Sequence, residues 1–185
     1  ESHLIPVCFV SAATGAGIRE LLDFMGNLLP NPVEGNPPGF ANGFGEDRVQ
    51  IKVSPSTEGH ALAHVFDVSF DPFVGRQVMF RVHQGTINKD GQLFVGDARK
   101  AIKITNLSSP LGKEVRERTK AIPGDIMMMA KVDSVQYDAV LHDSHDEDQI
   151  HLEALPLPTP MVGISLAPKH RGDEQKIAEV LSRLT

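Results

Sequence analysis

The hydrophobic positions near the start of the chain change from a continuous run to a helical repeat. Residues 5–10, IPVCFV, are apolar and rich in β-branched and aromatic residues, which predicts a buried strand. After the turn-like SAATGAG, apolar residues recur every three or four positions over residues 18–29, as on one helix face. Pro30 and Pro32 end this pattern. A strand, a glycine-containing turn and a helix in this order are typical of an α/β unit.

The pattern changes again after a segment dense in Pro, Gly and Asn. Residues 33–48 have a composition that favours neither a helix nor a central strand, so we place a domain boundary there. Residues 49–155 carry short alternating runs, such as VQIKV, ALAHVFDVSF and GRQVMFRVHQGTI, separated by turn signals such as NKDG. Short strands without long helices predict a mainly β fold, either a sandwich or a closed barrel. We favour the barrel, because about six strands are few for two full sheets.

The last part of the chain returns to an α/β pattern. Residues 161–167, MVGISLA, predict a strand, and GDEQKIAEVLSRL predicts an amphipathic helix whose apolar stripe includes Ile177, Val180 and Leu181. One strand and one helix cannot bury each other well. We therefore interpret residues 156–185 as the start of a further, truncated domain.

Charge is distributed unevenly along the chain, so the net charge of -6 hides a local basic segment. The overall value argues against a general nucleic-acid coat. Residues 99–120, however, are basic and are opposed only by Glu114 and Glu117. The basic residues are Arg99, Lys100, Lys103, Lys113, Arg116, Arg118 and Lys120. A local basic segment of this kind can contact phosphates, and the alternative is a solvated charged surface.

Several chemistries are not indicated by the residues. Cys8 is the only cysteine and lies in a predicted buried strand, which excludes a disulfide framework and fits a reducing compartment. No apolar run approaches the roughly 20 residues of a membrane helix, and the start shows no signal-peptide pattern. Histidines and acids crowd together over residues 142–151. We interpret them as a solvated loop, and we predict neither a metal site nor a catalytic residue.

Specific stretches resemble bacterial elongation factor G and its close paralogues. They are Asp71-Pro72, GRQVMFRVHQGTINKDGQLF, the PGD of residues 123–125, and PKHRGDEQKIAEVLSRL, and their order extends the resemblance over nearly the whole chain. The resemblance implies that residues 1–32 are the C-terminal end of a P-loop GTPase domain and that 33–48 are a linker. It implies that 49–155 are a closed Greek-key β-barrel of the translation-factor domain II type. Residues 156–185 then begin a ferredoxin-like α+β domain.

The resemblance also assigns a role to VSAATGAG. This stretch resembles the last motif of the GTPase domain, in which Ser11 and Ala12 lie beside guanine and backbone N–H groups approach its O6 atom. Spacing alone leaves the stretch open to the simpler interpretation of a βα connection. The sequence has no G-x-x-x-x-G-K-[ST] phosphate loop and no Asn-Lys-x-Asp motif. GTP and Mg²⁺ are thus expected to bind the parent GTPase, and this excised part is expected to bind no cofactor and not to hydrolyse GTP.

The resemblance further implies a ribosomal partner. In the family the barrel packs on the GTPase domain and docks on small-subunit ribosomal RNA during GTP-dependent translocation. The seven basic residues of 99–120 are our candidates for phosphate contacts. We expect a cytoplasmic monomer with no membrane partner.

One stretch departs from the family. Residues 132–149, VDSVQYDAVLHDSHDEDQ, stand where family members tend to carry a Thr-Gly-Asp-Thr-type turn. The alternative reading is therefore a divergent paralogue that does not translocate, or a ribosome-protection factor, acting as a ribosome-binding module.

Overall fold

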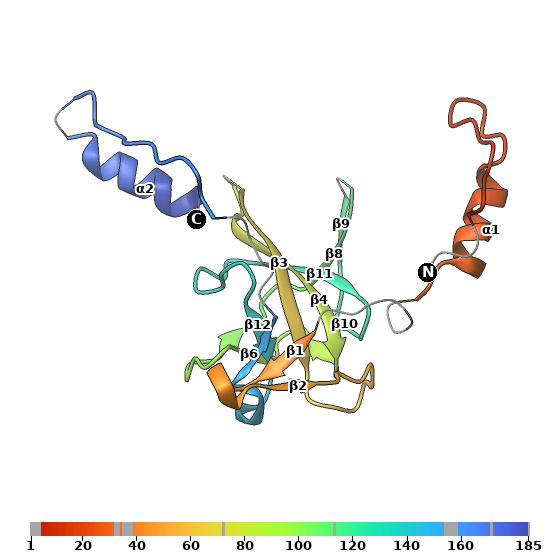
Figure 1. Ribbon diagram of the computed structural model, residues 1–185, viewed down its shortest axis with the longest axis horizontal. Helices are drawn as coiled ribbons and strands as arrows, with labels where there is room; N and C mark the ends of the chain where they lie inside the picture. Colours follow the sequence, from red (N-terminus) through yellow and green to blue (C-terminus); the bar gives the residue numbers. More distant parts are fainter. Residues whose placement is uncertain are drawn as a thin grey trace. The chain divides into compact units, whose positions relative to one another are not determined.

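The computed structural model describes residues 5–31, 34, 39–71, 73–112, 114–153, 159–170 and 172–184 (Figure 1). The chain divides into two units, Glu1–Pro37 and Pro38–Thr185, and each is described by itself. None of the described helices is long and apolar enough to cross a membrane.

The first unit contains one helix, α1 (Ile18–Leu28), which confirms the helix predicted from the apolar repeat. It begins after Gly17, whose φ of 72° lies in the left-handed region. A side chain at Gly17 would place its Cβ only 2.4 Å from the carbonyl oxygen of Phe9, so only glycine fits this turn. The helix ends where Leu29 turns to an extended conformation.

The strand predicted at residues 5–10 is wrong in this structure. These residues belong to no strand, and Phe9 is 92% exposed. Cys8 is exposed as well, whereas we expected it to be buried. A strand is stabilised by backbone hydrogen bonds to a neighbouring strand. The described part of the first unit supplies no such neighbour, so an apolar run alone does not make a strand.

The second unit contains three sheets of antiparallel strands. The largest has the order β7-β6-β12-β3-β4-β11-β8-β9. Its strands are β3 (Leu62–Asp71), β4 (Gly75–Gln84), β6 (Gln92–Val95), β7 (Ile102–Lys103), β8 (Ser108–Leu111), β9 (Glu114–Glu117), β11 (Ile126–Ala130) and β12 (Val140–His142). A two-stranded sheet pairs β5 (Ile87–Asn88) with β10 (Lys120–Ala121), and a three-stranded sheet has the order β13-β1-β2.

The large sheet curls around one hydrophobic core. Val78, Phe80 and Val82 alternate along β4 and are fully buried, which confirms the face predicted from the sequence. Met127 and Met129 enter the same core from β11. Register shifts in the β3–β4 pair, on either side of Ala63 and Val65, are the bulges that bend such strands. The sheet thus wraps its own buried side chains.

The mainly β class is confirmed, but closure into a barrel of about six strands is not shown. In the described residues the main sheet has eight strands, and its order ends at β7 and at β9. The hydrogen bond from Arg118 N to Leu107 O (2.8 Å) continues the β8–β9 ladder, and that from Lys89 N to Thr119 O (2.8 Å) continues the β5–β10 pair. No strand pairing between β7 and β9 is found among the described residues.

The segment predicted as a linker contains regular structure. Residues 40–42 form β1 (Phe40–Asn42), the middle strand between β2 (Val49–Ile51) and β13 (Ile150–Leu152). The first 3₁₀ turn, η1 (Gly45–Asp47), follows it. Phe40 is buried with Leu62, Val140 and Ile150 in a second, smaller core. Burial against distant strands thus outweighs the local Gly- and Asn-rich composition.

His83 of β4 lies beside this smaller core. Its ring meets Phe40 edge to face, with centroids 5.0 Å apart. Burial, with smaller contributions from the charges of Arg81 and His64, lowers the pKa of His83 to about 4. The ring is therefore neutral at neutral pH, which suits an aromatic contact.

The C-terminal part contains α2 (Glu174–Leu184), which confirms the second predicted helix. The strand predicted at 161–167 is wrong, because these residues pair with no strand and Met161 is 96% exposed. The reason is the same as at residues 5–10. The described residues offer no strand that pairs with this segment.

Candidate nucleic-acid interface

Three of the basic residues predicted to contact RNA lie on segments joined by one tight turn. The turn is residues 88–91, NKDG, which joins β5 to β6; Asp90 has a φ of 66°, and Gly91 N donates to Asn88 O. Lys120 is the register partner of Asn88, and Lys103 is the register partner of Gln92. Arg118 joins them because the next residue, Thr119, accepts a hydrogen bond from Lys89 N through its carbonyl oxygen (2.8 Å). The fold therefore brings Lys103, Arg118 and Lys120 to neighbouring segments.

The other predicted contacts lie elsewhere on the curled sheet. Arg99 and Lys100 follow the turn after β6, where Ala98 N donates to Val95 O. Arg116 is on β9, opposite Ser109 of β8. Lys113 lies outside the described residues. The seven residues thus do not form one continuous patch by backbone pairing.

Most of these cations have no acidic partner. Arg99, Lys100, Lys103, Arg118 and Lys120 are exposed and make no ion pair with any described residue. Arg116 differs, because its guanidinium lies 3.1 Å from the carboxylate of Glu114. A free, solvated cation is available to a phosphate, whereas a paired one must first leave its carboxylate.

Lys89 is a functional candidate that the sequence analysis missed. It lies in the 88–91 turn, beside the strands of Lys103 and Lys120, and it forms an ion pair with Glu117. The hydrogen bond and the charge of Glu117 raise the pKa of Lys89, and Lys89 in turn lowers the pKa of Glu117. The pair neutralises one of the two acids in the basic segment. NKDG indicated a hairpin only, and its lysine went unnoticed because the partner comes from a distant strand.

The turn at Ser11 and Ala12 has a defined backbone geometry. Ser11 N donates to Ala16 O (2.9 Å), Gly15 N donates to Ser11 O (2.8 Å), and the Ser11 hydroxyl accepts from Thr14 N (3.3 Å). The exposed Ala12 has no hydrogen bond from its N–H to any described residue. The turn thus engages the Ser11 amide internally and leaves the Ala12 amide as a donor for an external acceptor.

The histidine-rich segment is more ordered than the predicted solvated loop. It comprises β12, the 3₁₀ turn η2 (His145–Glu147) and β13, and His142 is fully buried. The prediction failed because β12 pairs with β3 and β6, which are far away in sequence. Within the described ranges, no group of three or more His, Cys, Asp or Glu side chains is arranged to hold a metal ion.

Comparison with known proteins identifies the class of structure. Residues 60–143 match the family model described as elongation factor G domain 2. The whole chain is 30% identical to elongation factor G of Chlamydia trachomatis serovar D, and 29% identical to elongation factor G of Petrotoga mobilis. In both comparisons 100% of this chain aligns with 26% of the relative, so the chain spans about a quarter of these proteins.

A solved structure shares the fold. The crystal structure of a protein from Thermus thermophilus superposes with a TM-score of 0.64 and 26% identity, over 91% of this chain and 22% of that one. The curled sheet at residues 60–143 thus matches domain 2 of elongation factor G. Over its whole length, the chain is similar to about a quarter of elongation factor G.

Proposed function

We propose that this chain is part of an elongation factor G-like GTPase that acts on the ribosome in GTP-dependent translocation. In this proposal the β-sheet unit packs on the GTPase domain and docks on small-subunit ribosomal RNA. The protein works as a cytoplasmic monomer, and GTP and Mg²⁺ bind to other parts of the parent protein. The family match supports the proposal, and the relatives bear the name elongation factor G.

The observation that carries RNA docking is the set of free cations around the 88–91 turn. Lys103, Arg118 and Lys120 are exposed and unpaired within the described structure, and backbone hydrogen bonds fix their segments beside the turn. Such cations suit phosphates, which are recognised by position rather than by base sequence. Arg99 and Lys100 offer a second contact of the same kind. Arg116 should contribute less to RNA binding, because its guanidinium forms an ion pair with Glu114.

Guanine contact is assigned to the Ser11–Ala12 turn. The free N–H of Ala12 can donate to a carbonyl such as O6 of guanine, and the methyl side chain lets the base approach the backbone. This chain itself should release no phosphate from GTP, because its sequence has no phosphate loop. Phosphate release above the no-protein background would contradict this part of the proposal.

A specific observation favours the second candidate, a divergent ribosome-binding paralogue without translocation. The stretch that departs from the family, residues 132–149, builds the ordered β12–η2 segment with a buried histidine. The coding sequence upstream of Glu1 separates the two candidates. A phosphate loop and an Asn-Lys-x-Asp motif there support the GTPase, and their absence supports the ribosome-binding module.

Docking can be tested by sedimentation of the 185-residue chain with small ribosomal subunits over a range of salt concentrations. The test variant carries Lys103→Glu and Arg118→Glu. Each phosphate contact contributes roughly 0.7 to 0.9 to the slope of log affinity against log salt, so losing two lowers the slope by about 1.4 to 1.8. Affinity at low salt falls at the same time.

The control variant, Arg19→Glu with Lys52→Glu, has the same change in net charge. Both of its residues are exposed and lie outside the 99–120 segment. It should bind nearly as the unmodified chain does. Equal binding by all three proteins refutes docking through the 88–91 turn, and equal weakening of both variants shows a general charge effect instead.

A further inference from the structure

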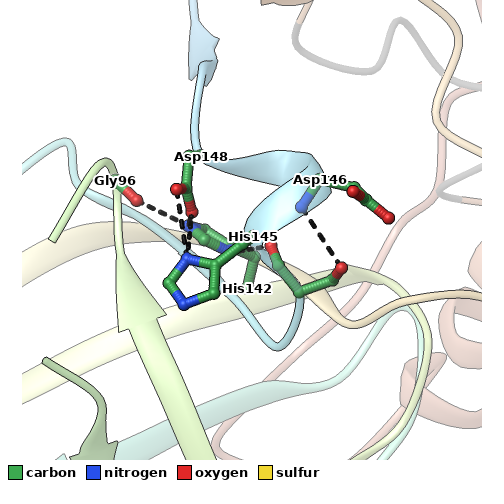
Figure 2. Close-up of polar contacts among 6 residues, drawn as sticks. Gly96, His142, His145, Asp146 and Asp148 are labelled. Carbon is green, nitrogen blue, oxygen red and sulfur yellow. Dashed lines mark hydrogen bonds and ion pairs between the residues drawn. The ribbon is translucent and has the colours of Figure 1, made fainter. Parts of the chain in front are cut away.

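His142 is a fully buried histidine that joins two turns of the β-sheet unit. It ends β12, between Leu62 of β3 and Phe94 of β6. Its Nδ1 lies 2.7 Å from the carbonyl oxygen of Ser144, and its Nε2 lies 2.7 Å from the carbonyl oxygen of Gly96. Figure 2 shows the ring between the Gly96 turn and η2.

Both contacts of the ring are made to carbonyl oxygens. A carbonyl oxygen only accepts a hydrogen bond, so a ring nitrogen that carries a proton donates to it. The ring is therefore placed to donate to Gly96 O through Nε2 or to Ser144 O through Nδ1.

A carboxylate and an aromatic ring lie beside His142. The nearest carboxylate oxygen of Asp148 lies 3.7 Å from Nε2 of His142. The ring of Phe94 stacks on His142 with centroids 5.8 Å apart and an interplanar angle of 27°. Packing against Phe94 helps to hold the orientation of the His142 ring.

Other charged groups lie on the elements packed against the ring. On the η2 side, His145 Nδ1 lies 3.1 Å from both oxygens of Asp148 and shares this acid with His142. On the β3 side, Asp143 accepts from Ala61 N and lies 3.5 Å from His60. On the β6 side, Asp97 lies in the Gly96 turn. The β3 and β6 residues directly opposite His142 are apolar.

The turn that His142 holds leads directly to two proposed RNA contacts. Gly96 has a φ of 51°, and its N–H donates to Val140 O (3.0 Å). The bond from His142 to Gly96 O fixes the same residue through its carbonyl group. Arg99 and Lys100 follow within the same exposed turn and have no acidic partner among the described residues. The backbone that carries them is thus anchored by His142.

We propose that His142 is a positioning residue for RNA docking, whose buried ring anchors the turn that precedes Arg99 and Lys100. The inference rests on the proposed function and names one residue that holds its RNA contact in place. Replacing the imidazole leaves Gly96 O without its side-chain partner, so docking through Arg99 and Lys100 weakens.

The anchoring of the turn is tested without RNA, by hydrogen exchange of the backbone amides of the 185-residue chain. In a folded His142→Phe variant, the amides of Gly96 and Ala98 should exchange faster than in the unmodified chain, because Gly96 O has lost its side-chain partner. Unchanged exchange at these amides overturns the proposal.

The positioning role is tested by sedimentation with small ribosomal subunits. Arg99→Ala with Lys100→Ala should lower the salt slope by up to about two, and His142→Phe should reproduce much of that loss. Adding His142→Phe to the double variant should cause little further loss. His170→Phe, which alters an exposed histidine outside β12 and η2, is the control and should bind normally.

The possible outcomes separate the positioning role from docking itself. If the Arg99/Lys100 variant loses affinity and a folded His142→Phe variant does not, positioning is refuted while docking stands. If the Arg99/Lys100 variant binds normally, both this contact and its positioning fail, whatever the variants at Lys103 and Arg118 show. If His142→Phe does not fold, His142→Asn decides, because its amide can replace the contact of Nδ1 to Ser144 O but is too short to replace that of Nε2 to Gly96 O. His142→Asn should lose affinity as the Arg99/Lys100 variant does, and normal binding by a folded His142→Asn variant refutes positioning.

Discussion

The neutral ring of His83 makes the stability of the fold depend on pH. The pKa of His83 is lowered from 6.5 to about 4, mainly by burial. Between these values the unfolded chain takes up a proton that the folded chain does not. The contribution of His83 to the free energy of unfolding is therefore fully present above about pH 6.5, and it is lost progressively as pH falls towards 4.

The magnitude follows from the size of the shift. One pKa unit corresponds to about 1.4 kcal/mol, so the full shift corresponds to an upper limit of about 3 kcal/mol. The ring is only partly buried, and solvent screening reduces the expected value to about 1–2 kcal/mol. Protonation of His83 would also alter its edge-to-face contact with Phe40.

The assay is urea unfolding at about pH 7.5 and about pH 4.5. The His83→Phe variant should lack about 1–2 kcal/mol of the pH-dependent loss seen in the unmodified chain, and the exposed control His170→Gln should retain it. Taking the difference between variants cancels the other histidines. Equal pH dependence in the unmodified chain and in His83→Phe refutes the reasoning.

Three further predictions concern packing and charge. Phe80→Ala should lower the free energy of unfolding by about 3–5 kcal/mol, because the ring is fully buried in the main core. Gly85→Ala should destabilise more than Gly75→Ala in the same urea experiment. Both glycines have positive φ, but a Cβ at Gly85 lies 2.5 Å from the Ala61 backbone whereas Gly75 faces open space. Arg116→Glu alone should reduce sedimentation with small subunits less than Arg118→Glu alone, because Arg116 is already paired with Glu114. The reverse order would contradict the role given to that ion pair.

Local patterns were sufficient where the deciding interactions are local. The apolar repeat predicted α1 and α2, and alternation predicted the buried face of Val78, Phe80 and Val82. NKDG predicted its tight turn because a positive φ at Asp90 depends on the residues of the turn itself. The predicted hairpin was wrong, because β5 and β6 on either side of the turn pair with other strands. The resemblance to elongation factor G likewise rested on ordered motifs that can be read directly from the chain.

Tertiary structure decided the features that depend on distant partners. The runs at 5–10 and 161–167 look like strands but pair with nothing in the described structure, whereas residues 40–42, within the Pro-, Gly- and Asn-rich segment, pair on both sides. Lys89 meets Glu117, and His142 meets Gly96, because strand pairing brings their segments together.

By itself, the sequence determined the helices, the tight turn, the core face of β4 and the basic character of residues 99–120. Only the tertiary structure decided which strands exist, which cations remain unpaired, and that one histidine is buried between two carbonyl groups. The physical reason is that side-chain periodicity acts over a few residues, whereas strand pairing, ion pairing and desolvation require partners that folding brings from far along the chain.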